Sequence, residues 1–531
     1  MKKILLLISL IAVIASMLYF TLTLKPPSLE VEVVSCSISI DKWRVERLFK
    51  LTLVNKGDSN ITISEVKVNG ATVKWASETP IITPGAKLRL YIYYPWAPLK
   101  KYSIEVITER GSVKTEVKAP ELKERRLKLV NTGEVSFKGI VSVEVFFSDK
   151  ECLPGCIKVV DEEGEETISQ MWGYILYDSG YVKTAVVSFI ANIPPKSSKV
   201  YKILLTSKPP EYEVEGILAV EESKNYIKVS NGLLTVGFNL SFAGSIDFFG
   251  DPSAGVNFAK IFKPPGTTLS ELYFFHGFID SVLDSNGKMY AIAMKTKVTV
   301  ESKGPLLVVV KRKWNLRLSG QAFDFYALPV NESYLLYRFV IVLKEELGLG
   351  ALAGTGEYTI YNPAGMGSFA ISHVAVKKAE FFLTPSGETY APLYPGLDIP
   401  AEKPVAACID HETGVYVALL SNDPVHPIGY WHLSRQKFPW HIWKGDKPSP
   451  STSEIGGYEY AKDLSFIAGV HKYMLCYVEQ RSDPWRRGGI VIRPGTYSWM
   501  TAVGAVVKKD VVSELKSAEN YFTKIVIEPA P

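Results

Sequence analysis

The residues most able to do chemistry in this sequence gather in one stretch, Pro424 to Trp443, which reads PVHPIGYWHLSRQKFPWHIW. Three of the seven histidines and three of the ten tryptophans lie in it. Indole rings can stack on the apolar faces of sugars, while imidazole and guanidinium groups bind hydroxyls or carboxylates. Because prolines interrupt the stretch, we expect an ordered loop or a strand-loop-strand segment on a rigid scaffold, not a helix.

Two later loops extend this candidate binding surface. The segment GGYEYAKD carries a glutamate between two tyrosines, and DPWRRGG carries a tryptophan beside two arginines. The alternative is that these rings fill the core of a large β-domain, because large aromatic side chains are usually buried. The candidate ligand-binding residues are Trp431, His432, Arg435, Trp440, His441, Trp443, Tyr458, Glu459, Trp485 and Arg486.

The reaction, if there is one, is not fixed by these residues. A glycoside hydrolase needs two carboxyl groups about 5 to 10 Å apart. Asp410 and Glu412 share one face of an expected strand, but no spacing identifies a pair. A polysaccharide lyase needs a base and a group that neutralises a uronate, and His432 or His441 with Arg435 would serve. The catalytic residues therefore stay unassigned.

The cysteines suggest disulfides and not a metal site. Cys152 and Cys156 enclose three residues, and we expect a local disulfide across that turn. Cys408 and Cys476 lie in strand-like runs and could form a second bridge, which leaves Cys36 as a buried thiol or an intermolecular link. A metal site would need a second Cys or His pair, and none lies near Cys152 and Cys156 in sequence. The sequence predicts no metal site and no cofactor.

The N-terminus suggests the compartment. Lys2 and Lys3 precede Ile4 to Leu24, an uncharged run of 21 residues. As a helix it would span about 31 Å, enough to cross a bilayer. The preceding lysines place the rest of the chain outside the cell, so we expect a single-pass protein of the cell membrane. A cleaved signal peptide and a pilin-type leader are the alternatives.

Composition describes an ordinary folded protein of several domains. The chain has 531 residues, of which 47% are hydrophobic and 22% are charged. The net charge of +5 is small and its basic residues are interspersed with acidic ones, which excludes a clustered basic face for nucleic acid. Glutamine is rare, as in proteins of hot environments that avoid labile amides.

Strand patterns predict an all-β fold behind the anchor. Asn69-Gly70 predicts a tight hairpin, and the alternation around Leu88 to Ile92 predicts a strand with one buried face. One helix is expected at Val511 to Phe522, with Asp510 as its N-cap. We predict a transmembrane anchor and Pro linker at 1–27, an immunoglobulin-like β-sandwich at 28–120, an accessory β-sandwich at 121–210 and a large super-sandwich at 211–531.

Three segments resemble known modules. The run NKGDSNITISEVKVNG, with ITPGAKLRLYI and KYSIEVITERGSV, resembles the small sandwiches of archaeal pilins and surface proteins, which implies a spacer or assembly module. The runs IKVVDEEGEETISQMW and TAVVSFIANIPPKSSKVYKILLTS resemble the accessory sandwich before the large β-domain of some polysaccharide lyases and α-mannosidases. The run IKVSNGLLTVGFNLSFAGSIDFFG is similar to the first hairpins of galactose-mutarotase-like super-sandwiches.

The resemblance does not supply an active centre. Mutarotases use two histidines and a glutamate on the concave sheet, but His276, His373 and His432 cannot be aligned to those positions. Lyases of the resembled kind usually carry a helical toroid, for which this chain has no room.

The sequence therefore predicts a membrane-anchored extracellular protein that recognises a polysaccharide or a glycoprotein glycan. Processing of that glycan by lyase or hydrolase chemistry stays open. The alternative is a non-catalytic structural protein of the cell surface, part of a layer or filament, that assembles with itself. Nucleic acid is not expected as a partner.

Overall fold

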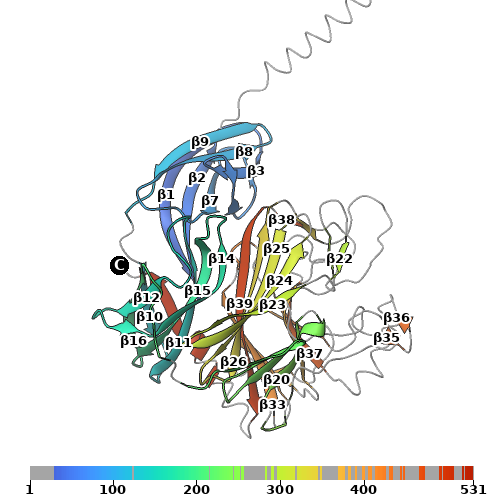
Figure 1. Ribbon diagram of the computed structural model, residues 1–531. Helices are drawn as coiled ribbons and strands as arrows, with labels where there is room; N and C mark the ends of the chain where they lie inside the picture. Colours follow the sequence, from blue (N-terminus) through green and yellow to red (C-terminus); the bar gives the residue numbers. More distant parts are fainter. Residues whose placement is uncertain are drawn as a thin grey trace, which may run out of the picture. The chain divides into compact units, whose positions relative to one another are not determined.

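The protein is almost wholly β in the part of the chain that the computed structural model describes. The described residues are 29–121, 125–213, 216–242, 244–251, 253–255, 257, 281–283, 289–291, 296–316, 320–344, 347–349, 369–376, 381–383, 389–390, 397–400, 405–409, 413–421, 423–425, 430–434, 443–444, 447–448, 466–472, 490–492, 494–507, 517–518 and 521–529. Figure 1 shows the chain as a ribbon and labels many of its strands.

The chain forms two compact units. Unit 1 comprises Met1–Ser37 and Arg47–Glu121, and unit 2 comprises Ile38–Glu46 and Leu122–Pro531. The boundary predicted at residue 210 is not a division between these units. Residues on both sides of it pack together in unit 2, where Gln170 Oε1 accepts hydrogen bonds from the backbone N–H groups of Leu306 and Leu307 at 3.1 and 3.0 Å.

Unit 1 is a β-sandwich. In one sheet β7 joins β2 and β5, and in the other β3 and β8 are central, with β4, β6 and β9 beside them. The rings of Phe49 on β2 and Tyr102 on β8 lie 5.4 Å apart, so the buried faces of the sheets meet. The strands are β1 (Leu29–Asp41), β2 (Arg44–Asn55), β3 (Ile61–Val68), β4 (Ala71–Thr72), β5 (Lys74–Ala76), β6 (Ile81–Ile82), β7 (Lys87–Tyr93), β8 (Lys101–Thr108) and β9 (Gly111–Lys118).

Two local predictions are confirmed in unit 1. Strand β7 alternates exposed or half-buried residues with the buried Leu88, Leu90 and Ile92. Asn69 and Gly70 have φ angles of 50° and 83°, the positive values that a tight turn between β3 and β4 requires.

Unit 2 begins with a second sandwich. One sheet has the order β14-β15-β11 and continues to the first residues of β2, and the other has the order β13-β12-β16-β10-β40. Phe189 on β15 and Tyr201 on β16 pack with ring centroids 5.1 Å apart. The strands are β10 (Arg125–Asn131), β11 (Phe137–Phe146), β12 (Ile157–Asp161), β13 (Glu166–Thr167), β14 (Ser169–Leu176), β15 (Val182–Ile193), β16 (Ser197–Leu205) and β40 (Ile525–Pro529).

A nine-stranded sheet dominates the rest of unit 2, in the order β23-β24-β25-β26-β39-β33-β32-β29-β30. Long antiparallel ladders join β24, β25, β26 and β39, whose apolar runs are buried on both faces. The strands are β23 (Lys297–Lys303), β24 (Leu307–Leu316), β25 (Gly320–Pro329), β26 (Tyr334–Leu343), β29 (Phe381–Leu383), β30 (Thr389–Tyr390), β32 (Val405–Ile409), β33 (Thr413–Ser421) and β39 (Gly495–Val507).

Smaller sheets complete unit 2. A four-stranded sheet has the order β17-β18-β19-β20, with Asn231 Oδ1 accepting from the backbone N–H groups of Leu233 and Leu234 in the turn between β18 and β19. A second four-stranded sheet has the order β28-β37-β34-β31. The elements are β17 (Ala219–Glu222), β18 (Tyr226–Ser230), β19 (Thr235–Asn239), η1 (Leu240–Phe242), β20 (Ser245–Gly250), β21 (Ser281–Leu283), β22 (Met289–Ala291), β27 (Leu347–Leu349), β28 (Phe369–Val376), β31 (Leu397–Pro400), β34 (Tyr430–Ser434), β35 (Trp443–Lys444), β36 (Lys447–Pro448), β37 (Phe466–Lys472) and β38 (Ile490–Ile492).

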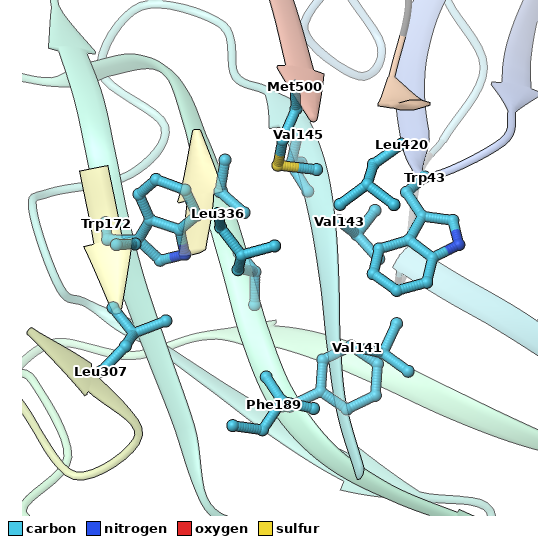
Figure 2. Packing of buried hydrophobic residues seen from close by; sticks show 14 of the residues in the cluster. Trp43, Val141, Val143, Val145, Trp172, Phe189, Leu307, Leu336, Leu420 and Met500 are labelled. Atoms are coloured by element: carbon cyan, nitrogen blue, oxygen red, sulfur yellow. The ribbon is translucent and has the colours of Figure 1, made fainter. Parts of the chain in front are cut away.

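The core of unit 2 draws on strands from the whole chain. Figure 2 shows Trp43 beside Val143 and Leu420, and Trp172 beside Leu336. The backbone N–H of Trp43 donates to the carbonyl of Leu420 at 3.0 Å. Residues 38–46 therefore belong to the packing of unit 2, although the two segments of unit 1 stand before and after them in sequence.

The predicted C-terminal helix is partly described. Residues 517–518 and 521–523 are helical, and the remainder of Val511 to Phe522 lies outside the described residues. Phe522 is buried against Trp43 and Tyr334, and Tyr521 Oη donates to the carbonyl of Ile140 at 2.8 Å. The following strand, β40, pairs with β10 and so completes the sheet of β10. Lys128 Nζ on β10 donates a hydrogen bond to Glu528 on β40, 400 residues later in the chain.

The local disulfide predicted at Cys152 and Cys156 is not formed in the structure, where both residues are free thiols. The turn is closed instead by a backbone hydrogen bond of 3.1 Å from Cys156 N to the carbonyl of Leu153. Cys36 is also a free thiol. Cys408 lies in β32 but Cys476 falls outside the described residues, so the second predicted bridge stays a prediction.

No helix within the described ranges is long and apolar enough to span a membrane. The predicted anchor, Ile4 to Leu24, lies outside those ranges and stays a prediction.

Candidate functional site

The candidate site is one row of the four-stranded sheet β28-β37-β34-β31. These strands read FAISHVAV, FIAGVHK, YWHLS and LDIP, and in β34 and β31 apolar residues alternate with other residue types. Such a period of two is typical of a strand with one face toward a core. The four strands come from distant parts of the chain, so the row exists only because of the sheet order.

The register aligns three polar residues across the sheet. His373 on β28 is opposite Gly469 on β37. Gly469 is in turn opposite His432 on β34, and His432 is opposite Asp398 on β31. Directly opposed residues of antiparallel strands lie on the same face of a sheet. His373, His432 and Asp398 therefore occupy one face, with a glycine between the two histidines.

A third histidine belongs to this face. His471 lies two residues beyond Gly469 on β37, opposite Ala370 of β28. Residues two apart on a strand share a face. The polar face of the sheet thus carries His373, His432, His471 and Asp398, which we call the histidine row.

The other face of the sheet carries mostly apolar positions. They include Trp431, which is opposite Ile399, and Leu433, which is opposite both Leu397 and Ala468. The predicted candidates Trp431 and His432 thus fall on opposite faces of β34. A ligand held on the histidine row does not meet position 431, and Trp431 belongs to the apolar face.

The remaining sequence candidates are not brought to the row. Trp443 lies in β35, a two-residue strand paired only with β36 in the described part of the chain. Among the predicted ligand-binding residues, only His432 is placed in the row by the strand register. Outside the described residues lie Arg435, Trp440, His441, Tyr458, Glu459, Trp485 and Arg486.

Sequence reasoning missed three members of the row. His373 and His471 stand in strands that begin with three consecutive apolar residues, so alternation does not mark their face. Asp398 lies in β31, between Leu397 and Ile399. No signal in the sequence could have told that these strands are neighbours of β34.

The most strongly perturbed charges of the described residues lie elsewhere in unit 2. Glu144 on β11 accepts from Arg44 Nη1 at 2.6 Å and from Arg338 Nη2 at 2.5 Å. Ser421 Oγ donates at 2.8 Å to Oε2, the oxygen that Arg44 binds, and Ser498 Oγ donates to Oε1, the oxygen that Arg338 binds. We call these five residues the Glu144 network.

The electrostatics of the network favour full ionisation. Burial alone would raise the pKa of Glu144, but the guanidinium groups of Arg44 and Arg338 outweigh it and lower the pKa to about 2. Arg44 also pairs with Glu46 at 2.8 Å and lies 3.6 Å from Asp423. Burial alone would lower the pKa of Arg44, but Glu144, Glu46 and Asp423 outweigh it and hold that pKa above the ordinary value.

A perturbed pKa often marks a functional site, but this network is closed to ligands. The side chains of Arg44, Glu144 and Arg338 are 2%, 0% and 0% exposed. Their hydrogen bonds are made to neighbouring side chains, such as Arg338 to Thr184, and to the backbone, such as Arg338 to the carbonyl of Gly173. We therefore assign the network to the stability of unit 2 and not to chemistry.

No group of three or more His, Cys, Asp or Glu among the described side chains is arranged to hold a metal ion. These side chains do not include those of the histidine row, whose residues are placed by backbone register alone.

Comparisons with known proteins give no family. No family model matches the sequence, and no curated protein matches it. Among solved structures, the chain is similar to an α-mannosidase from Enterococcus faecalis V583, with a TM-score of 0.38 and 11% identity over 77% of this chain and 46% of that one. A glycosyl hydrolase family 38 protein from Enterococcus faecalis gives a TM-score of 0.38 and 10% identity over 77% and 48%.

A third similar structure is a TPR-domain containing protein from Parabacteroides distasonis, with a TM-score of 0.30 and 10% identity over 69% of this chain and 55% of that chain. The chain spans less than half the length of either Enterococcus protein. An α-mannosidase is one of the groups that the accessory sandwich resembles in sequence, but similarities this low assign neither a family nor an activity.

Proposed function

We propose that this protein recognises a polysaccharide or a glycoprotein glycan at the polar face of the sheet β28-β37-β34-β31. The observation that carries the proposal is the register that aligns His373, His432 and Asp398. Imidazole and carboxylate groups are suited to hydrogen-bonding sugar hydroxyls, and a sheet is a rigid support for them. The opposite face of the same sheet is mostly apolar, which suits packing onto a core.

The proposal includes a place for the protein in the cell. Ile4 to Leu24 anchors the chain in the membrane, and the residues after Lys25 lie outside the cell. In this proposal unit 1 and the accessory sandwich are immunoglobulin-like modules of a stalk, and the remaining strands form a mutarotase-like super-sandwich head. Support comes from the apolar N-terminal run and from the sandwich packing of unit 1 and of the second sandwich.

The direct test measures glycan binding by the full-length chain in detergent. The chain is titrated with a panel of neutral and acidic polysaccharides by calorimetry, and each mixture is monitored for ultraviolet-absorbing unsaturated products. We expect at least one polysaccharide to bind, and His432→Ala to weaken that binding by about tenfold or more, as the loss of one charged or polar contact does. Lys158→Ala, at a half-exposed position on β12, serves as the control and should bind like the wild type.

The alternative is a structural protein of the cell surface. If no polysaccharide binds and the purified chain forms regular assemblies, this alternative replaces our proposal. Equal binding by wild type and His432→Ala would keep a glycan partner but remove the histidine row as its site.

A further inference from the structure

We propose that Asn331 is a site of N-glycosylation, at which the chain carries a covalently attached oligosaccharide of its own. Asn331 begins the triplet Asn331-Glu332-Ser333, which fits the acceptor pattern N-x-S/T with a middle residue other than proline. The inference goes beyond the proposed glycan recognition and does not use the histidine row. It rests on the outward-facing location proposed above, because N-glycans are typical of exported chains.

The sequence holds three triplets of this kind, which we call sequons: Asn60-Ile61-Thr62, Asn239-Leu240-Ser241 and Asn331-Glu332-Ser333. The pattern alone does not distinguish them. An attached oligosaccharide is bulky and polar, so the acceptor asparagine must present its amide on a surface loop. The structure describes all three sequons, and they differ in this respect.

Asn331 lies in the turn between β25 and β26. Strand β25 ends at Pro329 and β26 begins at Tyr334, so the whole sequon lies outside the strands. Asn331 and Ser333 are both exposed. Asn331 has a φ of 58°, in the left-handed region that asparagine adopts more readily than most residues. The sequon is therefore displayed on a surface turn.

Backbone hydrogen bonds hold this turn on both sides of Asn331. The N–H of Val330 donates to the carbonyl of Leu306 at 2.8 Å. The carbonyl of Ser333 accepts from the N–H of Ala505 at 3.1 Å. Because the flanking backbone fixes the turn, the turn does not need the Asn331 amide as a hydrogen-bonding group.

The surface beside Asn331 has room for sugars. A Cβ on Gly216 would lie 3.3 Å from Asn331 Oδ1, so the amide lies next to a residue that has no side chain. The following residue, Ile217, is 65% exposed, and Leu233 is 53% exposed. A Cβ on Gly232, which precedes Leu233, would lie 3.9 Å from Ile217 Cδ1. An oligosaccharide on Asn331 thus meets an open surface whose exposed apolar side chains suit the apolar faces of sugars.

The same criteria exclude Asn239, which is half-buried. Its Nδ2 donates to Asp247 Oδ2 at 3.1 Å, and its Oδ1 accepts from the backbone N–H of Ser241 at 3.1 Å. Tyr226 Oη donates to Asp247 Oδ1 at 2.6 Å and holds that carboxylate in place. A sugar on Nδ2 would have to lie where the amide meets Asp247, so we expect Asn239 to stay unmodified.

Asn60 is exposed, but its sequon continues directly into β3. Ile61 is 2% exposed, and Thr62 pairs with Ile81 of β6. Because acceptor sequons belong to surface loops, we confine the proposal to Asn331, whose sequon is not part of a strand.

The modification is a glycosyl transfer. The donor is an oligosaccharide joined through C1 of its first sugar to a phosphate group on a membrane lipid. Nδ2 of Asn331 forms a new bond to C1, the bond from C1 to the phosphate oxygen breaks, and its electron pair leaves with the phosphate. The amide loses one proton, and nothing is oxidised or reduced.

The test maps tryptic peptides of the full-length chain isolated from the membranes of the cells that make it. Peptide 318–338 contains the sequon of Asn331 and no other, and peptide 229–260 contains that of Asn239 and no other. We expect mass spectrometry to find peptide 318–338 enlarged by the mass of several sugars, with the addition on Asn331. Peptide 229–260 should have its unmodified mass.

Variants made in the same cells assign the addition to the sequon. Asn331→Asp, whose new side chain also tolerates a positive φ, and Ser333→Ala should each remove the addition completely. Ser333→Thr keeps the acceptor pattern and is the matched control, which should retain it. Wild-type urea midpoints show that the variants fold. An unmodified peptide 318–338 in the wild type, an addition that survives Ser333→Ala, or a sugar on Asn239 would overturn the inference.

Labelling of intact cells separates this inference from the proposed location. A membrane-impermeant amine reagent should modify exposed lysines such as Lys56 and Lys196 if the chain after Lys25 lies outside the cell. A labelled chain with an unmodified Asn331 would reject the glycosylation site and keep the location, whereas an unlabelled chain with an unmodified Asn331 would reject both. A modified Asn331 in a chain that binds no polysaccharide would support the site and reject the proposed glycan recognition.

Discussion

Replacement of Glu144 by glutamine tests whether the Glu144 network stabilises unit 2. Glutamine has the size of glutamate but no charge, and its NH2 group cannot accept a hydrogen bond. If that group takes the place of Oε2, the bonds from Arg44 Nη1 and Ser421 Oγ are lost, and N–H donors then face each other. Arg338 keeps hydrogen bonds to Thr184 and to the carbonyl of Gly173 but loses its carboxylate partner in the described structure.

The expected loss follows from these contacts. A hydrogen bond to a charged group contributes about 1.5 to 3 kcal/mol and a neutral one about 1 kcal/mol. Because Glu144 and Arg338 are both 0% exposed, water cannot replace the lost partners. We expect Glu144→Gln to lower the free energy of unfolding by about 3 to 5 kcal/mol, the range for breaking one side of a buried ion pair. That is a large share of a typical total of about 5 to 15 kcal/mol.

The assay is urea unfolding followed by tryptophan fluorescence, because Trp43 and Trp172 lie in the core of unit 2. The midpoint should fall while the dependence on urea stays as in the wild type. The control is Glu528→Gln, which breaks the ion pair of Lys128 and Glu528, whose side chains are 37% and 47% exposed. Such a pair contributes about 0 to 1 kcal/mol.

The pH dependence gives an independent check. The pKa of Glu144 is about 2 in the folded protein and ordinarily 4.5. The unfolded chain therefore binds this proton more readily, so the stability that ionised Glu144 contributes is present above pH 4.5 and is lost as the pH falls toward 2. The difference in free energy of unfolding between the wild type and Glu144→Gln should therefore become smaller as the pH falls from 4.5 toward 2. A Glu144→Gln protein within about 1 kcal/mol of the wild type at neutral pH, or one no less stable than Glu528→Gln, would refute the reasoning.

Three further predictions concern single residues. Burial raises the pKa of Glu332 to about 7, so the folded state holds the proton more tightly and the free energy of unfolding should fall as pH rises from 4.5 to 7. Glu332→Gln should remove this fall and stabilise the protein by about 1 to 2 kcal/mol at alkaline pH, and an unchanged pH profile of unfolding would contradict it. Gly320 has a φ of 144°, and a Cβ there would lie 1.9 Å from the carbonyl oxygen of Val342. Gly320→Ala should therefore lower the free energy of unfolding by about 2 kcal/mol or more, measured by urea unfolding. A wild-type urea midpoint would contradict this prediction. Burial raises the pKa of the Cys152 thiol to about 12, so iodoacetamide should label it in the folded protein much more slowly than the half-buried Cys36, and both should react after unfolding without reductant. Peptide mapping that finds Cys152 unlabelled after unfolding would mean that it is bonded.

Part of the candidate site could be predicted from sequence. His432 was found because it stands in a dense aromatic stretch, and it is the one sequence candidate that the register brings to the row. Trp431 was grouped with it because the two are adjacent, yet neighbours on a strand lie on opposite faces. His373 and His471 come from other strands, and their positions beside His432 depend on sheet order, which residue spacing does not encode.

The sequence by itself determined the local structure. Alternation predicted the buried face of β7, the Asn69-Gly70 pair predicted a turn with positive φ angles, and the apolar runs predicted an all-β chain. These features depend on backbone sterics and on which side of a strand a residue lies, so a few neighbouring residues suffice to specify them.

Only the tertiary structure decided which strands meet. Arg44 and Ser498 are 454 residues apart yet hydrogen-bonded at 2.9 Å, and β40 at the chain end completes the sheet of β10. The histidine row arises in the same way, from four strands that are separate in the chain. Pairing between distant strands is selected by the packing of the whole core, because many ladders satisfy the same local pattern and only one buries these side chains together.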